Sequence, residues 1–461
     1  MRYKLTKELL KVIYTMKSDI EKFIPTYIKD VSDVTDTPKI YIKFSALHLT
    51  SSIFSRFFII PDIAMQCKPN IMVVLASIPG RTRRSTLTSF DNQIYENVYG
   101  DLLNKIKTIS KDNLDEMVSN SIFEEGSPEG IFDGMIKYRK ELLNTPFLRS
   151  PRYKNTLNID FQSPEFGEII KNIGSRSAYQ RGMGSLISRS YYGEGGKVSL
   201  STRGGKDIRY LPRGIYATMF AGMQTANLYI DPYHVSQGLL RRIILINADA
   251  NRHLPFLDAE RQRKQEYIDT ASNLLIKKLD TVMNKFEHID PGFTHIPVFF
   301  APEVKKKINE VDVERTKDID SDNENYYFLV RQSDGEHLSK LSSLVAIDDL
   351  SFYGPGLFVR TEHYNLSKKY FDEATCNNYE IFENIGVKNL PPESDKEGLN
   401  KVLRIIKRYP GGVNKSTVTK MSNMVVKKLD PILDTLEDSK RIIKKTTLVK
   451  GHETTLYYPN K

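Results

Sequence analysis

The sequence contains no tryptophan and only two cysteines, Cys67 and Cys376. Two cysteines allow at most one disulfide and exclude a zinc site built from cysteine alone. The eight histidines show neither HxH nor HxxxH spacing, so they indicate no metal site. We also identify no pair of a nucleophile and a base. The scarcity of cysteine favours a reducing compartment, and we expect a cytoplasmic protein.

Long apolar runs are missing as well. The most apolar stretch, residues 57–80, is interrupted by Asp62 and Lys68, and a bilayer span needs about 18 consecutive apolar residues. The basic residues after Met1 lead into a charged segment, not into the apolar core of a secretion signal. We therefore expect neither secretion nor a membrane partner.

The composition is typical of a globular protein, with 461 residues, 40% of them hydrophobic and 27% charged, and the length suggests two or three domains. The net charge is +10, from 67 basic and 57 acidic residues. Residues 396–461 hold 15 of the basic and 6 of the acidic residues, which leaves 52 against 51 elsewhere. A basic module on a neutral body indicates a polyanionic partner, with nucleic acid the leading candidate and acidic protein the alternative.

Apolar spacing predicts alternating helices and strands. Helical spacing covers residues 1–60, with a break at Pro25 and a second helix at about 43–58. Buried strands are expected at residues 71–75, 156–161, 215–220 and 243–247. This alternation predicts an α/β fold with a largely parallel sheet. Glycines at 193–196 and 204–205 predict hairpin turns within residues 191–209.

The clearest domain boundary is the segment 391–395, which holds two prolines and a polar cluster. We predict a helical N-terminal extension at 1–68, an α/β core at 69–300, a helical, lid-like region at 301–390 and a C-terminal module at 396–461. The module combines three helices, one capped near Asn414, with strands at 442–449 and 454–458, and resembles a winged helix-turn-helix domain. Such domains bind DNA or dock on protein.

The loop after the first buried strand runs through Gly80 to Thr86 and precedes a helix at 87–106. A nucleotide loop needs backbone amides at a helix N-terminus, a cation for the outer phosphates and a hydroxyl for magnesium. Arg84 would supply the cation and Ser85 the hydroxyl. Arginine replaces the lysine of the pattern GxxxxGK[ST], and Arg83 stands where that pattern has glycine. The alternatives are an ordinary basic loop and an anion site without catalysis.

Four segments in this order resemble a known family. They are residues 68–75 leading into 80–86, then 126–131, 164–170 and 238–244. Across roughly residues 40–260 the chain is similar to P-loop proteins of archaeal and bacterial viruses and plasmids, which are themselves similar to ring-forming replicative helicases. Archaeal members often carry an Arg-[Lys or Arg]-Ser-Thr phosphate loop, which residues 83–86 match. The resemblance implies a RecA-like core that uses ATP and Mg2+.

The resemblance also implies roles for residues. Arg84 would contact the outer phosphates, and Ser85 or Thr86 would help to hold magnesium. Glu165 would position the attacking water. Pro164 replaces the aspartate of the family, and Asp160 is the nearest substitute. The alternative for Glu165 is a helix N-terminal carboxylate. The implied nucleotide-binding residues are Gly80, Arg81, Thr82, Arg83, Arg84, Ser85 and Thr86.

Three further residues complete the implied site. Gln224 follows a strand, where related ATPases place a sensor of the γ-phosphate. Arg241 or Arg242 would act as an arginine finger in the site of a neighbouring subunit, which implies a ring, with a hexamer favoured. The alternative for the two arginines is a salt-bridging pair at a helix end.

Basic residues on the hairpin, with Tyr191 and Tyr192 before them, would suit a loop that grips a DNA strand, although the sequence slightly favours a plain solvated hairpin. In the terminal module, acidic residues such as Asp430 and Asp434 argue against close insertion of the third helix into a groove. The candidate DNA-binding residues of both regions are Lys197, Arg203, Lys206, Lys415, Lys420, Lys427, Lys428, Lys444, Lys445 and Lys450.

The sequence thus predicts an ATP-dependent DNA translocase or replicative helicase of a mobile element, acting as a ring. The alternative is a P-loop protein that has lost hydrolysis and serves as a DNA-binding or scaffold subunit. The altered phosphate loop and Pro164 favour this second interpretation, and the arginine pair favours the first.

Overall fold

The structure is a computed structural model, which describes the residues 20–61, 67–77, 82, 84–106, 121–123, 128–143, 157–163, 166–167, 178–202, 205–224, 238–248, 258–289, 294–321, 326–378, 401–409, 411–422, 429–430, 432–433, 436–437, 441–449 and 452–459. Contacts divide the chain into two compact units, Met1–Glu383 and Asn384–Lys461. Among the described helices, none combines the length and the apolar character that crossing a bilayer requires.

The first unit is built around a five-stranded sheet with the order β3-β4-β7-β2-β8. All neighbouring strands in it are parallel. β2 lies near the middle and is buried on both faces, which explains its continuous apolar run Met-Val-Val-Leu-Ala. The expected α/β fold with a parallel sheet is confirmed. The strands are β2 (Met72–Ser77), β3 (Ile122–Phe123), β4 (Leu157–Ser163), β7 (Ile215–Gln224) and β8 (Ile243–Asn247).

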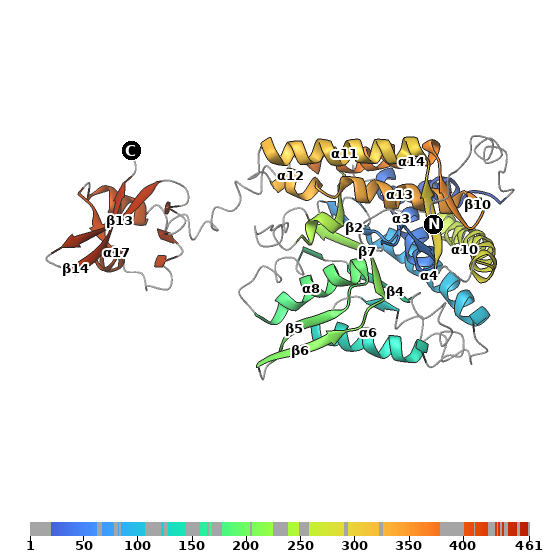
Figure 1. Cartoon of the computed structure of the whole chain (residues 1–461), viewed down its shortest axis with the longest axis horizontal. Coiled ribbons are helices and arrows are strands. Elements are labelled where there is room, and N and C mark those ends of the chain that lie inside the picture. The colour runs from blue at the N-terminus through green and yellow to red at the C-terminus, as the bar shows by residue number, and fades with distance from the viewer. Residues whose placement is uncertain are drawn as a thin grey trace. The chain divides into compact units, whose positions relative to one another are not determined.

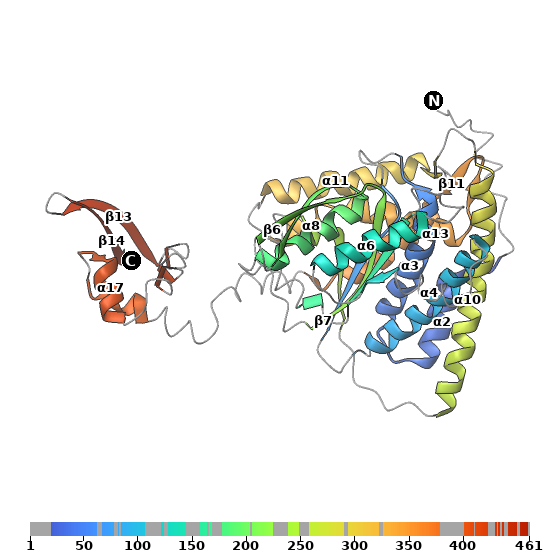
Figure 2. The same ribbon diagram turned by 90° about the horizontal axis from the view of Figure 1, so that it is seen from below.

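Helices connect these strands and cover the sheet. α8 packs against β7, and α10 packs along α4. Figure 1 shows α8 and α6 on one side of the sheet and, on the other, α3 (Lys39–Phe54), α13 (Asp334–Asp348) and α11 (Pro302–Ser321). Figure 2 shows α4 and α10 side by side. The connecting elements are α4 (Arg84–Ile106), α6 (Pro128–Leu143), α8 (Ala178–Tyr192), the short 3-10 helix η3 (Leu240–Arg242) and α10 (Asp258–Glu287).

The helix α3 (Lys39–Phe54) corrects the expected N-terminal extension. It packs against β2, β4 and β7, and nearly all of its residues are buried. The hydroxyl of Ser51 donates to the carbonyl of Pro69 at 3.1 Å and accepts the amide of Ile71 at 3.0 Å, which ties α3 to the start of β2. α3 is therefore part of the core, together with the helix α2 (Phe23–Val34) that packs on it. It also begins four residues before the expected start at 43.

A second sheet, with the order β1-β9-β11-β10, places two short strands, β10 and β11, within the region 301–390 that was expected to be helical. β1 and β11 flank β9 in parallel, and β10 pairs antiparallel with β11. The strands are β1 (Phe58–Ile59), β9 (Ile296–Phe300), β10 (Phe352–Tyr353) and β11 (Gly356–Val359). The helices of this region are α11 (Pro302–Ser321), α12 (Tyr326–Arg331), α13 (Asp334–Asp348) and α14 (Thr361–Thr375).

The second unit is a small α/β module with its own apolar core. A three-stranded sheet has the order β12-β14-β13, with both pairings antiparallel. The side-chain oxygen of Asn414 accepts the amide of Thr417 at 2.8 Å, the N-cap that the sequence predicts. The core residues are Val402, Ile405, Ile406, Val413, Val418, Leu429, Leu433, Leu436, Ile442 and Tyr457. The named elements are β12 (Val413–Asn414), α17 (Lys415–Ser422), β13 (Ile442–Val449) and β14 (His452–Pro459).

Candidate functional site

The carboxyl ends of β2, β7 and β8 meet at one edge of the central sheet. Ser77, the last residue of β2, lies opposite Gln224, the last residue of β7. On the other side of β2, Ala76 lies opposite Asn247, which ends β8. The loop that follows Ser77 in the sequence and the predicted sensor Gln224 therefore start from neighbouring positions.

The connections out of β2 and β7 run in opposite directions. From β2 the chain continues through α4 to β3 and β4, at one end of the strand order. From β7 it continues to β8, at the other end of the strand order. Two adjacent parallel strands whose connections leave in opposite directions form a topological switch point, and open parallel sheets bind ligands outside the strand ends at such a point. The edge between Ser77 and Gln224 is thus the candidate site.

The predicted phosphate loop is described in part. Thr82 is buried, and its hydroxyl donates to that of Ser77 at 2.8 Å. α4 begins at Arg84 and has no acidic residue in its first turn, where Ser85 is exposed and Thr86 half-buried. A helix N-terminus with hydroxyls and a cation suits an anion, so these residues fit a phosphate group. Gly80, Arg81 and Arg83 lie outside the described residues.

The side chain of Arg84 contacts backbone carbonyls at the switch point. Its Nη1 donates to the carbonyl of Leu75 in β2 at 2.9 Å and to that of Met223 in β7 at 2.5 Å. Both acceptors are neutral, so these bonds hold the guanidinium in place without cancelling its charge. Arg84 therefore links the phosphate-loop strand to the strand that carries Gln224.

Asp160 is wrong as a substitute for the missing magnesium carboxylate. Asp160 lies in β4 opposite Thr218 of β7. The next residue of β7, Met219, lies opposite Met72, the first residue of β2, so Asp160 is level with the N-terminal end of β2. At about 3.3 Å per residue, this level is about 20 Å from Ser77, at the opposite edge of the sheet. Asp160 is also fully buried and bonded to His48 at 2.8 Å, to Thr218 at 2.8 Å and to Gln162 at 3.0 Å. Its role is to join α3, β4 and β7.

His48 completes this buried pair. Burial lowers the pKa of His48, the Asp160 carboxylate raises it, and the net shift is upward. The His48 ring also stacks on Phe220, with ring centres 5.0 Å apart. This histidine is therefore an ion-pair partner in the core.

The predicted catalytic Glu165 lies outside the described residues. The strand before it ends at Ser163, which lies opposite Ala221 in β7, and Ala221 lies opposite Val74 in β2. β4 thus runs towards the same edge as β2 and β7, and Glu165 follows Ser163 by two residues. Gln224 itself is half-buried at that edge.

The two predicted finger residues precede β8 and lie at the opposite edge of the sheet, since Ile243 pairs with Met72 at the start of β2. Both are half-buried. Arg241 donates to the side chain of Gln332, and Arg242 donates to the carbonyl of Gly238. The guanidinium of Arg242 also lies over the ring of Tyr192, 5.1 Å from its centre. Within the described residues, these contacts of both arginines go to neutral groups.

Acid should destabilise the protein through His337, which donates to the carbonyl of Arg241 at 2.9 Å. Burial lowers the pKa of His337 to about 4, whereas the unfolded side chain titrates near 6.5. Between these values only the unfolded chain binds the proton, so stability falls as the pH falls, by about 3 kcal/mol in full.

The matched variant is His337→Gln, whose amide still donates a hydrogen bond but does not titrate. Urea unfolding at pH 7 and pH 4 should show a loss for the wild-type protein that exceeds the loss for the variant by about 3 kcal/mol. Equal losses in the two proteins would contradict this role of His337.

The predicted hairpin is confirmed. β5 (Gly196–Thr202) and β6 (Gly205–Leu211) pair with each other in register, so that Lys197 lies opposite Tyr210. One face packs inward, with Val198 and Leu211 buried and Arg209 paired with Asp133 of α6.

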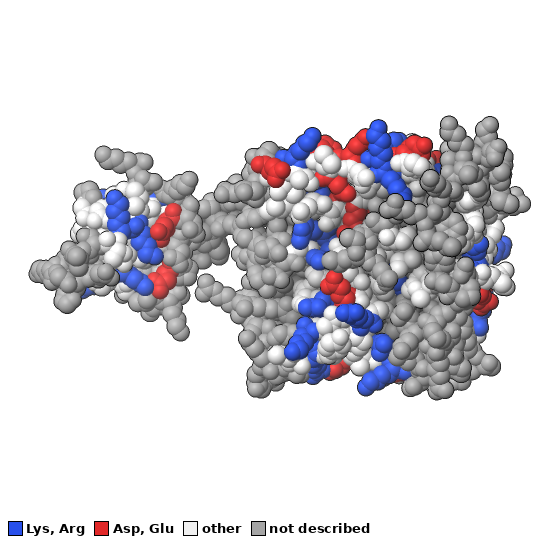
Figure 3. All heavy atoms as spheres, in the orientation of Figure 1, with Lys and Arg blue, Asp and Glu red and all other residues white. Residues whose placement is uncertain are grey.

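The outer face of the hairpin, which consists of Lys197, Ile208 and Tyr210, is exposed. Ile208 is 63% and Tyr210 64% accessible, the largest values among the described apolar side chains. Figure 3 shows basic side chains gathered over the region of β5, β6 and α6. Arg203 and the side chain of Lys206 lie outside the described part of the chain.

Tyr191 and Tyr192 are wrong as the aromatic partners of the hairpin. Tyr191 is buried, and the hydroxyl of the half-buried Tyr192 donates to Glu336 at 2.9 Å. Tyr210, on the exposed face of β6, is instead the aromatic residue that accompanies the basic residues of the hairpin. Strict alternation along β6 places Ile208 and Tyr210 on one face, a signal that was available in the sequence.

In the second unit, the described basic residues differ in their surroundings. Lys420, Lys444 and Lys445 are exposed, whereas Lys415 is half-buried and 2.5 Å from the carboxylate of Asp430. Lys444 lies 3.8 Å from Glu437. Ion pairs between surface side chains contribute little free energy, so the surface of the second unit that carries these lysines remains basic. Lys427, Lys428 and Lys450 lie outside the described residues.

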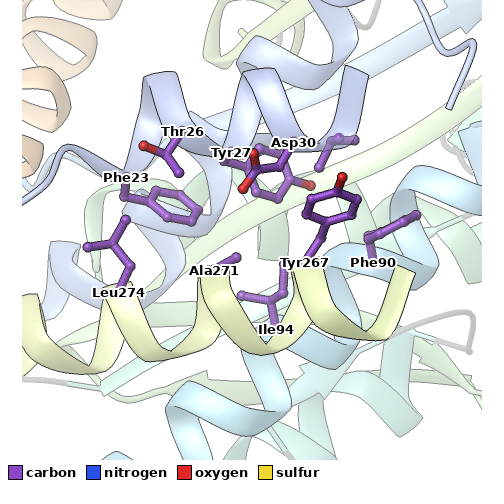
Figure 4. A pocket seen from close by; sticks show the side chains of 10 residues that line it. Phe23, Thr26, Tyr27, Asp30, Phe90, Ile94, Tyr267, Ala271 and Leu274 are labelled. Atoms are coloured by element: carbon purple, nitrogen blue, oxygen red, sulfur yellow. The ribbon is translucent and has the colours of Figure 1, made fainter. Parts of the chain in front are cut away.

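Two other features of the first unit do not form the site. A small pocket between α2, α4 and α10 is lined mainly by apolar side chains, with Asp30 the charged residue among them (Figure 4).

The group Asp349, Glu362 and His363 has the donor types of a metal site. However, Nδ1 of His363 accepts the amide of Arg360, so Nε2 carries the proton that it donates to Asp349 at 3.1 Å. Lys22 already pairs with Asp349 at 2.6 Å.

Comparison with known proteins does not assign the chain to a family. Neither the protein-family models nor the curated proteins that were searched gave a match.

Proposed function

We propose that this chain is an ATP-driven motor on DNA, a translocase or replicative helicase of a mobile element. The observation that carries the proposal is that Ser77, which the predicted phosphate loop follows in the sequence, lies opposite Gln224 at the switch point between β2 and β7. The strand order adds support, because β7 stands between β2 and β4, as expected of a RecA-like core. Turnover of ATP that requires magnesium and that DNA stimulates is the activity the proposal demands.

We assign the separate contacts to the nucleotide to different residues of the loop. The first turn of α4 offers amides and the hydroxyls of Ser85 and Thr86, and the arginines of the loop offer positive charge. We assign the attacking water to Glu165 and the sensing of the terminal phosphate to Gln224. When bound, Mg2+ neutralises charge on the phosphates, and Ser85 would supply the hydroxyl that holds it.

The proposal includes a ring, in which an arginine of one subunit completes the site of the next. Arg241 suits this role better than Arg242. The bond of Arg241 goes to the exposed Gln332 side chain, whereas Arg242 is held by a backbone carbonyl and by the ring of Tyr192. Releasing Arg241 therefore breaks fewer contacts.

DNA has two candidate contact regions. The outer face of the hairpin joins a cation, Lys197, to an aromatic ring, Tyr210, which is the combination that single strands require for backbone contact and base stacking. In the second unit, α17 lies between β12 and the antiparallel pair β13 and β14, an order that supports a winged helix-turn-helix domain. Its excess of basic residues suits a polyanion.

The second candidate function is a DNA-binding or scaffold subunit without hydrolysis. Two observations favour it. Asp160 is too far from Ser77 to support magnesium, and Arg84 is bonded to backbone carbonyls. A protein of this kind binds DNA through the same two regions and shows no ATP turnover.

Tyr210→Ala should weaken binding of single-stranded DNA by about tenfold, because stacking of a base on an aromatic ring contributes about 1–3 kcal/mol. Tyr210→Phe retains the ring and should bind as the wild-type protein does. Fluorescence anisotropy with a labelled oligonucleotide, at several salt concentrations, measures both variants. Equal affinity of the alanine and phenylalanine variants would remove the hairpin from the DNA site.

A further inference from the structure

The carboxyl tip of β2 is held from both sides by side chains of other elements. On the β7 side, Arg84 joins the carbonyls of Leu75 and Met223. On the β8 side, the hydroxyl of Tyr41 donates to the carbonyl of Ala76 at 2.5 Å and accepts the amide of Ala248 at 3.2 Å. The phosphate-loop strand is thus joined to both neighbours just before its last residue.

Tyr41 is well placed to hold this tip rigidly. It is the third residue of α3 and is fully buried, so its hydroxyl has no access to water as a substitute partner. Its two backbone partners lie on different strands, since Ala76 belongs to β2 and Ala248 directly follows β8. A single hydroxyl group therefore bridges the two strand ends at the candidate site, beside the parallel pairing that already joins Ala76 to Asn247.

We propose that Tyr41 is a positioning residue of the nucleotide site, which fixes the tip of β2 against β8 and so sets the place of the phosphate loop. The inference rests on the proposed nucleotide site. Tyr41 acts through the backbone of residues 76 and 248, since both bonding functions of its hydroxyl are used there. Binding of phosphate depends on amides held in advance in the correct direction, and a loop on a loose strand end loses that preorganisation.

The test compares Tyr41→Phe with Tyr95→Phe. Each variant removes one buried tyrosine hydroxyl from the first unit. The hydroxyl of Tyr95 contacts that of Ser121 at 3.1 Å, away from the tip of β2. A general loss of stability should therefore be similar in both proteins, and only Tyr41→Phe should change the site.

Hydrogen–deuterium exchange without nucleotide is the first readout. In Tyr41→Phe, amides of residues 75–86 and of Ala248 should exchange about tenfold faster than in the wild-type protein, because a buried amide and a buried carbonyl lose their partner. Tyr95→Phe should leave these amides unchanged. Exchange at the tip that is the same in both variants would overturn the proposal.

Calorimetric titration with ATP and Mg2+ is the second readout. Tyr41→Phe should bind ATP about tenfold more weakly than Tyr95→Phe. Equal affinity of the two variants would also overturn the proposal. A wild-type protein that binds no ATP would refute the proposed function itself, and the exchange measurement would still decide whether Tyr41 holds the tip.

Discussion

Replacing Asp348 with alanine should lower the free energy of unfolding of the first unit by about 3–5 kcal/mol. Asp348 ends α13, and its carboxylate accepts the amides of Phe23 at 2.7 Å and Ile24 at 3.0 Å at the start of α2. The same carboxylate lies 3.3 Å from the ammonium of Lys278 in α10. The two side chains are 4% and 1% exposed, so the substitution leaves two helix-terminal amides without their acceptor and a buried cation with only the backbone carbonyl of residue 348 as its partner.

The control for Asp348→Ala is Asp280→Ala, which removes an exposed carboxylate that pairs with Lys105 on the surface. A surface pair contributes about 1 kcal/mol or less, so this variant should remain close to the wild-type protein. Burial raises the pKa of Asp348 even with Lys278 beside it. The pair is therefore costly to bury, and the double variant Asp348→Ala, Lys278→Met should recover part of the loss. Urea unfolding at pH 7 measures all three, and a single-variant loss under 1 kcal/mol would contradict the account.

Glu165→Gln should lower ATP turnover by about 100-fold or more and leave ATP affinity within about threefold. Glutamine keeps the size and polarity of the side chain but cannot accept the proton of the attacking water. The matched control is Glu168→Gln, three residues further in the same segment.

Steady-state kinetics separates the two effects of Glu165→Gln, because the loss belongs to kcat and not to nucleotide binding. Turnover that is unchanged in Glu165→Gln, or reduced equally in Glu168→Gln, would remove the assigned role from Glu165.

Parts of the fold that depend on local pattern were predictable. β2 and β8 were expected because a short apolar run between polar loops is typical of a strand buried on both faces. The hairpin at β5 and β6 was expected from its glycines, and the helix cap at Asn414 from its side chain. In each case, the residues that decide the structure lie within a few positions of one another.

Other parts depend on contacts between distant residues. β1 has two residues and pairs with β9, more than 200 positions later, so no local pattern marks it. The carboxylate that caps α2 at Phe23 comes from Asp348, 325 positions away. The placement of α3 in the core followed neither from its helical spacing nor from its position before the sheet, because a helix that is apolar all round shows no preferred face.

The same distinction applies to the candidate site. The loop at residues 80–86 and Gln224 were visible in the sequence, but that Ser77, before the loop, lies opposite Gln224 depends on the strand order. Asp160 failed as a magnesium residue because the register of β4, which no local signal reveals, places it at the other edge. Tyr41 was missed because its role is a bond to two strand ends, and a tyrosine near the start of a helix has no distinguishing pattern.

The central claim is most directly tested by magnesium-dependent ATP turnover of the purified full-length protein, measured without DNA, with single-stranded DNA and with duplex DNA. Glu165→Gln, purified in the same way, controls for contaminating ATPases. The account predicts turnover that DNA increases and that Glu165→Gln lacks. Turnover no greater than that of Glu165→Gln under all three conditions would contradict a motor and favour a protein that binds DNA without hydrolysing ATP.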